Sequence, residues 1–464
     1  MARRAPQIGI LRAMLLALLL AVDVALRPFV KVDAPAVALE HVRVIDGTGA
    51  PPREDQTIFI AGGKLVAQAP ANALRIDLSG RTVMPGLVGM HDHFFYPMGG
   101  AIFGEMAFSF PRLYLAAGVT TIRTAGSIEP YTDLEIKKAI DAGKAPGPSI
   151  FISGPYLEGP DSFALQMHAL RGPDDARAFV NFWADQGATS FKAYNTLSRA
   201  ELGAAIEAAH KRKLKVTAHL CSIGFTEAAR LGIDDLEHGL LVDTEFFAGK
   251  KPDQCPNPRE ALVELAKMDA ADPRLAQLVA ELVKRKVAIT STLAVFDAFT
   301  EAGFRRALTP AVLEAVSADT RARLLQAHIA RDPAIWTAAI KLEMAFERAF
   351  AQAGGLLIAG CDPTGNGAVL AGFGDWRDLE LLVDAGFTPL EALKIHSLNG
   401  AIWLGQQDRI GTIAPGKDAD LVVVQGDPAK NIADVEKVEI VFRQGVGYDS
   451  RELFNSVRGV VGMR

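Results

Sequence analysis

An α/β fold, whose larger part is a (β/α)8 TIM-like barrel, is what this sequence predicts. Eight short apolar runs follow one another through the middle of the chain, and each is separated from the next by a segment long enough for a crossover helix. Strand-and-turn patterns lie on both sides of these runs. The 464 residues exceed one typical domain, so we expect one large and one smaller domain.

The composition is that of an ordinary globular protein. Hydrophobic residues make up 49% of the chain and charged residues 22%, which allows a large buried core. The formal net charge is -5 and no long run of Lys and Arg is present, so the clustered positive charge of nucleic-acid-binding proteins is missing. We therefore predict a small-molecule substrate and no nucleic-acid partner, and the sequence leaves homo-oligomer formation open.

The N-terminal segment 1–30 has the features of an export signal. Positive charge in MARR precedes the apolar run Met14–Val22, which is too short to span a bilayer. The alternative is a buried or membrane-anchoring helix, because Asp23 closes the run and no clean cleavage site follows closely. We predict a periplasmic or secreted protein that contacts a membrane only through this segment, if it is not cleaved. Three widely spaced cysteines predict no disulfide framework.

The remaining chain divides into β-rich ends and an α/β middle. Short strands broken by Gly and Asp fill 34–84, and the pattern at 405–447 is suited to complete the same β domain. Between them, 85–404 holds the eight runs TVMPGLVGM, GVTTIRTAG, PSIFISG, TSFKAYN, LKVTAHL, DDLEHG, VAITSTL and LLIAGCD. Connections near 240–285 and 296–355 are oversized and rich in Ala, Leu, Glu and Arg. We expect them to be helical inserts that wall the active-site face.

Within the stretch PGLVGMHDHFFY, an apolar run ends at two histidines separated by one residue. Alternate side chains of a strand point to one face, so His91 and His93 project together into the barrel mouth. Neutral imidazole is a good metal ligand. His219, His238 and Asp362 stand at the ends of later strands, where barrel enzymes carry their chemistry. Together these residues predict a metal site.

Lys192, in SFKAY, faces the same mouth. A charged lysine buried beside metal ions is costly, so it must pair or lose its proton. The neutral amine can add carbon dioxide to form a carbamate whose two oxygens bridge two cations. An ion pair with a carboxylate is the alternative that the sequence leaves open. Five protein side chains and a carbamate exceed what one tetrahedral ion uses, so we expect two divalent ions, with zinc as the expected metal.

Three further residues are candidates for substrate contact. Tyr194 follows Lys192 by two residues and can reach the mouth, where its hydroxyl can bind a carboxylate or carbonyl; ordinary packing is the alternative. His168 follows the third strand, although a lone loop histidine is more often solvated. Arg123 can also contact the substrate, and the alternative is a structural ion pair beneath the mouth of the barrel. Cysteines beside the ligands, such as Cys221, are expected to pack as small apolar groups.

Longer motifs carry a resemblance to a known family: VMPGLVGMHDH, GVTTIRTAG, SFKAY, KVTAHL, LEHG, AGCDP and LGQQDRIGTIAPGKDADLVVVQGDP. The chain resembles the amidohydrolase superfamily, binuclear metal-dependent type, in the branch of imidazolonepropionase-like and prolidase-like enzymes. The resemblance covers almost everything after the N-terminal segment. It implies that the β segments at both ends build one composite β-sandwich beside the barrel.

The same resemblance implies a set of metal ligands. One ion is held by His91, His93 and Asp362, and the other is held by His219 and His238. The family also implies a nucleophile, a hydroxide that bridges the two ions, because metal binding lowers the pKa of water from about 15.7 to around 7. Asp362 then takes a proton from the nucleophile and returns it to the leaving nitrogen.

The bridging role falls to a carboxylated Lys192 by this resemblance. We expect hydrolysis of an amide, as in a dipeptide or an N-acyl amino acid. Two departures affect substrate identity: Thr124 stands where many relatives carry Asp, and the insert before the last ligand is longer than usual.

Other activities remain as alternatives. A cyclic-amide hydrolase of the hydantoinase or dihydropyrimidinase kind also has a bridging lysine, and a lactonase would use the same centre. A single-metal deaminase requires a Glu shortly after the histidine of the fifth strand, whereas His219 is followed by LCSIG. A non-catalytic scaffold would have lost ligands, and here all six are present.

Overall fold

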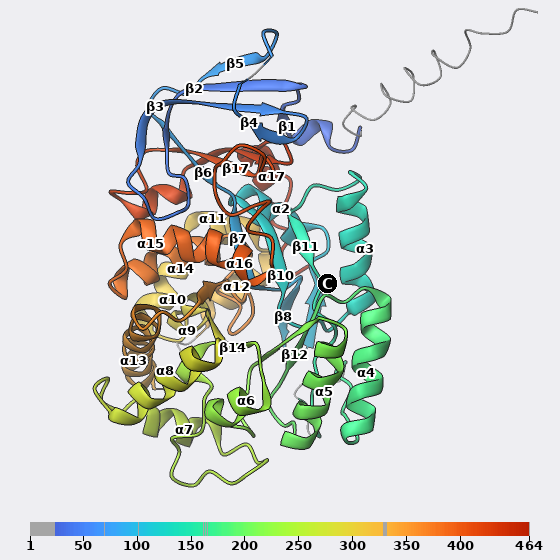
Figure 1. Ribbon diagram of the computed structural model, residues 1–464, viewed down its shortest axis with the longest axis vertical. Coiled ribbons are helices and arrows are strands. Elements are labelled where there is room, and N and C mark those ends of the chain that lie inside the picture. Colours follow the sequence, from blue (N-terminus) through green and yellow to red (C-terminus); the bar gives the residue numbers. More distant parts are fainter. Residues whose placement is uncertain are drawn as a thin grey trace, which may run out of the picture.

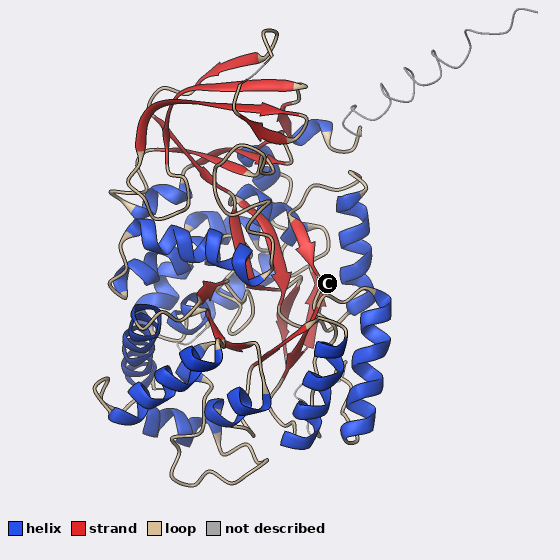
Figure 2. Ribbon diagram, in the orientation of Figure 1, coloured by secondary structure: helices blue, strands red, loops and turns tan. Residues whose placement is uncertain are grey.

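The computed structural model describes residues 24–463 apart from 69, 101, 161, 163, 165 and 328–331. The apolar run Met14–Val22 of the expected export signal lies outside these residues. A β-sheet stands at one end of the molecule, and strands surrounded by helices make up the rest (Figure 1, Figure 2). Within the described part of the chain, no helix is long and apolar enough to cross a membrane.

Strands from both ends of the chain share one nine-stranded sheet. The N-terminal segment supplies β1 (Val30–Val32), β2 (Ala36–Val44), β3 (Arg53–Ala61), β4 (Lys64–Val66), β5 (Leu74–Asp77) and β6 (Arg81–Pro85). The C-terminal segment supplies β17 (Leu421–Gln425), β18 (Val438–Arg443) and β19 (Val446–Asp449). The two groups join where β6 pairs antiparallel with β17, with Pro85 opposite Leu421.

This sheet curls around an apolar core of its own. The Leu65 N–H donates to the Lys417 carbonyl at 2.9 Å, which brings the edge strand β4 back to the chain just before β17. Alternate residues along β2 and β17, among them Val37, Leu39 and Val423, are fully buried in this core. The two terminal segments therefore fold as one unit.

The eight predicted strands of the α/β body are confirmed, and the hydrogen-bonded pairs among them are parallel. They are β7 (Leu87–Asp92), β10 (Val119–Thr124), β11 (Ser149–Phe151), β12 (Ser190–Ala193), β13 (Lys215–Ala218), β14 (Asp235–Glu237), β15 (Ala288–Ser291) and β16 (Leu357–Ala359). They lie in two sheets, with the orders β11-β10-β7 and β12-β13-β14-β15-β16. The carboxyl ends of neighbouring strands therefore share one edge, where a site can form.

Hydrogen bonds connect the edges of these two sheets. At one junction Ser153 and Ser190 form an isolated parallel bridge. At the other, the Asp362 N–H donates to the His91 carbonyl at 2.8 Å. The arrangement is TIM-barrel-like, but the described residues do not form the single closed ladder of the expected barrel. The chain after β11 contains Pro155, which has no N–H to donate, and β16 ends after three residues.

A helix follows each of the eight strands and covers the sheets from outside (Figure 1). These helices are α2 (Ser109–Ala116), α3 (Pro130–Asp141), α4 (Pro173–Gln186), α5 (Arg199–Lys211), α6 (Phe225–Leu231), α8 (Pro273–Arg285), α13 (Pro333–Gln352) and α14 (Phe373–Asp384). In α5, the Ser198 N–H donates to the Glu201 carboxylate at 2.9 Å, which forms a capping box. Leu202, Ile206 and Ala209 then recur at helical spacing and are buried.

The two long connections contain additional helices. The first holds η2 (Gly239–Leu241) and α7 (Pro258–Leu265), and the second holds α9 (Leu293–Asp297), α10 (Glu301–Ala307), α11 (Pro310–Ala315) and α12 (Ala318–Gln326). Asn257 starts α7, because its side chain accepts the Arg259 N–H and Pro258 occupies the first helical position.

The remaining elements are short. They are η1 (Arg27–Phe29), the hairpin β8 (Phe95–Gly99) and β9 (Ile102–Glu105), α15 (Pro389–Lys394), η3 (Ile395–Asn399), α16 (Gly400–Trp403), η4 (Ile432–Glu436) and α17 (Ser450–Asn455).

One expectation about the cysteines is wrong. Cys221 and Cys255 form a disulfide, with Cα atoms 4.8 Å apart, and Cys361 is buried as a free thiol. The sequence separation of 34 between Cys221 and Cys255 suggested no contact, but the connection after β14 turns back over the end of β13. Sequence separation alone does not decide which thiols meet.

Candidate active site

Six predicted residues meet at the carboxyl ends of the strands. His91 lies on β7 and Lys192 on β12. His93, His219 and His238 directly follow β7, β13 and β14, and Asp362 lies three residues after the end of β16. They line one cavity of about 230 Å³. Its lining consists of His91, His93, Phe95, Phe103, Tyr156, Lys192, Tyr194, His219, His238, Val295, Phe296, Phe299, Asp362, Thr364 and Gly365.

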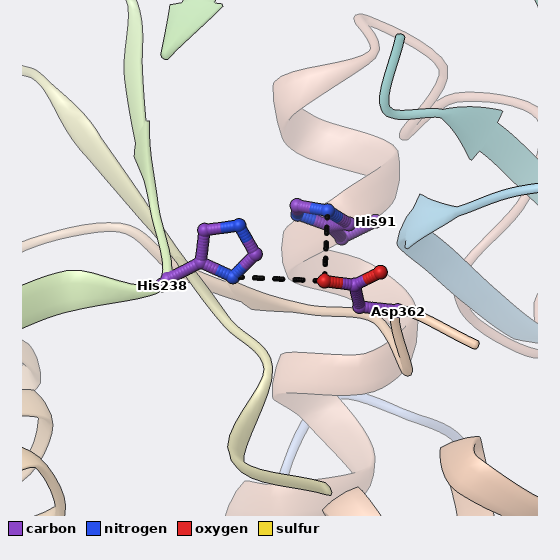
Figure 3. Close-up of side chains that lie close together, drawn as sticks. All are labelled: His91, His238 and Asp362. Atoms are coloured by element: carbon purple, nitrogen blue, oxygen red, sulfur yellow. Dashed lines mark ion pairs between the residues drawn. The ribbon is translucent and has the colours of Figure 1, made fainter. Parts of the chain in front are cut away.

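The carboxylate of Asp362 faces three imidazoles. Its Oδ2 lies 3.6 Å from His91 Nε2 and 4.0 Å from His238 Nδ1, and its Oδ1 lies 3.6 Å from His93 Nε2. Figure 3 shows His91, on β7, and His238, directly after β14, directed at the same oxygen of Asp362. The ring of His219 lies 4.6 Å from that of His238, so all four histidines are neighbours. His91, His238 and Asp362 offer ligand atoms within 4.8 Å of one another, which is close enough to share a metal ion.

Hydrogen bonds orient three of these rings, and one of them joins His238 Nδ1 to Thr292 Oγ1 at 2.7 Å. His91 Nδ1 lies 2.7 Å from Glu237 Oε2, and because a carboxylate only accepts, the ring carries its hydrogen on Nδ1. His93 Nδ1 likewise donates to the Gly126 carbonyl at 3.3 Å. The lone pairs on both Nε2 atoms therefore point toward Asp362. This outer support of the imidazole is typical of metal-binding histidines.

Burial keeps the histidines neutral. It lowers the pKa of His91, His93 and His238 well below the ordinary value, and that of His219 to about 3. The positive charge of Lys192 adds to this effect. Neutral imidazole is the form that coordinates a metal ion, so the four rings need no deprotonation to bind one.

Lys192 is almost completely buried, with 1% of its surface exposed. Burial lowers the pKa of its amine to about 8, although the charges of Glu237 and Asp362 oppose this change. Its Nζ lies 2.9 Å from His91 Nε2. In the described part of the chain, Lys192 forms no ion pair with a carboxylate, so the alternative left open by the sequence is not the arrangement seen.

Unusual backbone conformations help to place two of the residues. His238 and Asp362 both have positive φ angles, 69° and 46°, which non-glycine residues seldom adopt. Alternation along a strand would send Glu237 and His238 to opposite faces. The left-handed conformation of His238 ends β14 and lets both residues approach His91, whose ring lies 4.4 Å from that of His238. Strained backbone of this kind often occurs at functional sites.

The three weaker candidates have different positions. Tyr194 lines the cavity, and its ring lies 4.7 Å from that of His219. His168 lies outside the cavity lining, with its Nε2 3.1 Å from Asp175 Oδ2.

Arg123 is fully buried beneath the cluster and is also outside the cavity lining. Its Nε donates to the Met90 carbonyl at 2.7 Å, and its Nη2 donates to Glu237 at 2.9 Å. The structure therefore gives Arg123 the ion pair beneath the mouth, where it holds Glu237, in place of the expected contact with substrate.

Sequence reasoning missed two residues of the site. Glu237 orients His91, and its position directly before His238 in LEHG was the available signal. Tyr156 lines the cavity and packs against Tyr194, with ring centroids 4.9 Å apart. It follows the third strand in SGPYLEG, so its place after a strand end was a usable signal.

A second pocket of about 380 Å³ adjoins the first, because His219 and Phe296 line both. Helices α7, α9 and α13 of the long connections contribute much of its wall. The lining consists of Asn195, His219, Cys221, Leu241, Val242, Asp243, Thr244, Cys255, Pro258, Arg259, Ala261, Leu262, Val263, Leu265, Phe296, Asp332, Ile335 and Trp336. Most of these side chains are apolar, and Arg259 forms an ion pair with Asp332.

Known proteins resemble the chain in sequence pattern and in fold. The profile described as amidohydrolase family matches residues 82–251 and 343–446. A comparison with curated proteins found no match.

Solved structures resemble almost the whole chain. A putative prolidase from Bifidobacterium longum has 24% identity and a TM-score of 0.68, covering 89% of this chain and 94% of that one. A Xaa-Pro dipeptidase with bound methionine has 19% identity and a TM-score of 0.68, covering 89% of this chain and 100% of that one. A bottromycin amidohydrolase has 20% identity and a TM-score of 0.67, covering 95% of this chain and 94% of that one. These similarities support the TIM-barrel-like α/β fold.

Proposed function

Because the chain belongs to the amidohydrolase family and is a metal-dependent enzyme, we propose that it hydrolyses the amide of a dipeptide or an N-acyl amino acid with a free α-carboxylate. The observation that carries this proposal is the cluster of four neutral histidines, one carboxylate and one buried lysine in a single cavity. The alternative substrates are cyclic amides and lactones, which the same cluster would also activate.

The residues fit two divalent ions, for which we propose zinc. His91, His93 and Asp362 would hold one ion, and His219 and His238 would hold the other. The two imidazoles fixed by Glu237 and Gly126 present unprotonated nitrogens, as a metal ligand must. When bound, the ions polarise the scissile carbonyl and lower the pKa of water so that it attacks near neutral pH.

We propose that Lys192 carries a carbamate between these two groups of ligands. Its lowered pKa makes the neutral amine available near physiological pH. The neutral amine nitrogen bonds to the carbon of carbon dioxide and releases one proton, so a neutral side chain becomes an anionic one with two oxygen donors. The absence of an ion pair to Lys192 among the described residues supports this role, because no carboxylate competes for the amine.

Asp362 is the proposed proton carrier. Its Oδ1 accepts a hydrogen bond from Thr364 Oγ1 at 2.7 Å, which fixes the rotation of the carboxylate. The carboxylate takes a proton from the attacking water and gives it to the leaving nitrogen, so the amine departs as a neutral group.

The two pockets suggest how such a substrate is held. The apolar pocket beside the cavity suits the acyl group or side chain of the substrate, since it meets the cluster at His219 and Phe296. Tyr194 is the proposed donor to the substrate carboxylate or carbonyl. The prolidase and the Xaa-Pro dipeptidase among the structural relatives support a dipeptide-like substrate.

A substrate screen of the metal-loaded enzyme tests this proposal. We expect dipeptides or N-acyl amino acids to turn over faster than hydantoins, dihydropyrimidines and lactones. Amidation of the substrate carboxylate should lower kcat/KM by roughly ten- to a hundredfold, because a hydrogen bond to a charged group contributes about 1.5–3 kcal/mol. Faster turnover of a cyclic amide than of every carboxylate-bearing amide would assign the enzyme to the cyclic-amide class.

We also propose that the protein is exported to the periplasm or secreted. The charged and apolar N-terminal pattern supports export, and so does the Cys221–Cys255 disulfide, because disulfides persist in oxidising compartments. N-terminal sequencing of the protein from its native host should find a start after the apolar run. An intact Met1 in the soluble cytoplasmic fraction would contradict export.

A further inference from the structure

A second cluster of donor groups lies behind the cavity, on the outer side of the same strands. Asp92 stands between His91 and His93, and Cys361 directly precedes Asp362. Because alternate side chains of an extended chain point to opposite faces, Asp92 and Cys361 project away from the cavity. There they meet Asp375 of α14 and His396 of η3, and all four residues are completely buried (0% exposed).

The donor atoms of this outer cluster are close together. Cys361 Sγ lies 3.3 Å from Asp92 Oδ1, and His396 Nε2 lies 3.5 Å from Asp375 Oδ1. One donor atom each from Asp92, Cys361 and Asp375 falls within 4.8 Å of the other two. His396 is not part of this group and lies beside it, against Asp375. Ligands 2.0–2.3 Å from a tetrahedral zinc ion are separated by roughly 3.3–3.8 Å, so the Cys361–Asp92 and His396–Asp375 contacts match edges of such a site.

Two of these buried atoms, Asp92 Oδ2 and Asp375 Oδ1, make no hydrogen bond. The ring of His396 interacts with the backbone of Val88. Asp375 Oδ2 is engaged differently, since it accepts the Gly372 N–H at the start of α14. Among the described residues, no Lys or Arg forms an ion pair with Asp92 or Asp375. The carboxyl groups of Asp92 and Asp375 and the thiol of Cys361 are therefore three acidic groups at one buried point, and either protons or a cation must balance their charge.

We propose that Asp92, Cys361 and Asp375 hold a third divalent metal ion, separate from the ions in the cavity, and that His396, which lies against Asp375, completes the site when the ion binds. One thiolate, one imidazole and two carboxylates form a donor set suited to zinc, with no position left for substrate, as expected of a structural site. The ion would tie β7 and the turn after β16 to α14 and η3. Since those strands also carry His91, His93 and Asp362, the outer site would position the inner ligands.

Cobalt substitution separates the two sites by spectroscopy. The inner ligands offer nitrogen and oxygen only, and Cys221 and Cys255 are paired, so Cys361 is the one thiol among the three cysteines. The full chain loaded with Co²⁺ should therefore show a sulfur-to-cobalt charge-transfer band in the near ultraviolet. The band should disappear in Cys361→Ser, with one metal equivalent fewer per chain by elemental analysis. It should persist in His219→Ala, which weakens only the inner site.

Two results would overturn the proposal. The first is a wild-type protein that binds cobalt in its inner site without any sulfur-to-cobalt band, because the outer cluster is then neutralised by shared protons. The second is equal metal content in the wild type and Cys361→Ser. If Cys361→Ser does not fold, the wild-type spectrum alone gives the answer. A Cys221→Ser/Cys255→Ser variant must keep the band, since its loss there would place the sulfur ligand elsewhere.

Discussion

The polar cavity and the apolar pocket beside it come from different parts of the chain. Strands and the residues shortly after them supply the metal-ligand candidates of the cavity, such as His91, Lys192 and Asp362. Helices of the long connections supply most of the pocket wall, including Leu262 and Trp336, and the disulfide completes it. The proposed catalytic residues thus lie on or near the ends of the central strands, whereas the residues proposed to select the substrate lie in the inserted segments. Changes in the cavity should affect every substrate, and changes in the pocket should affect only some.

Removing the proposed bridge should have the largest effect. Lys192→Ala is expected to lower metal content and to reduce kcat/KM for all substrates by more than about 100-fold, because even outer residues of a metal site contribute roughly 10–100-fold. Elemental analysis and steady-state kinetics measure both effects. Lys211→Ala, on the surface of α5, is the matched control. A Lys192→Ala enzyme with normal metal content and turnover would rule out the bridge, whereas partial rescue by a short carboxylic acid would support it.

The pH dependence of metal reconstitution tests whether the neutral amine of Lys192 is required for metal binding. Only the neutral amine adds carbon dioxide, and the pKa of Lys192 is lowered to about 8, so its neutral fraction rises with pH up to that value. The rate at which the metal-free protein recovers activity should increase about tenfold from pH 6 to pH 7 and level off above pH 8.

The measurement uses stopped assays at constant dissolved carbon dioxide and constant free zinc. The histidines do not produce this dependence, because they are already neutral in that range; for His219 the pKa is about 3. A recovery rate that does not change between pH 6 and pH 8 would contradict a lysine-dependent step.

Substitution of Glu237 tests whether the hydrogen bond that orients His91 is as important for metal binding as the ligands themselves. Glu237→Gln keeps the size of the side chain but removes the charge that holds His91 Nδ1 and pairs with Arg123. We expect a loss of metal affinity of roughly 10–100-fold. Competition with a chelator gives the affinity, and Glu207→Gln on the exposed face of α5 serves as the control. Unchanged affinity would mean that His91 is oriented without Glu237.

Trp336 tests the pocket. Its ring stacks on Phe299 at 4.9 Å and on Phe296 at 5.8 Å, so Trp336→Ala enlarges the pocket without touching the cluster. The kcat/KM for substrates with long or aromatic acyl groups should fall about tenfold, since an apolar pocket contact contributes roughly 1–3 kcal/mol. Acetylated substrates should be unaffected, and Phe182→Ala on α4 is the control. An equal loss for short and long acyl groups would end the distinction between the two regions.

The same division explains what the sequence could predict. Alternation within HDH and the placement of His219, His238 and Asp362 after apolar runs were enough to assemble the cavity, because parallel strands end at one edge. Lys192 could be recognised because burying a charged amine is unfavourable unless the amine pairs or loses its proton.

The pocket and the outer cluster could not be predicted in this way. Cys221 and Cys255 meet because an irregular connection folds back, and nothing in their spacing indicates that. Arg123 lies on a strand like the ligands, yet it faces Glu237 beneath them, so strand position alone misplaced it. His396 belongs to a helical turn whose contact with α14 follows from long-range packing.

Anomalous diffraction at the zinc absorption edge tests the central claim most directly, namely that the cavity is a two-metal centre bridged by Lys192. Crystals of protein purified without chelator should show two peaks in the cavity, one beside His91, His93 and Asp362 and one beside His219 and His238. Continuous electron density should extend from Lys192 Nζ to both peaks. A single cavity peak next to an unmodified lysine would contradict the account.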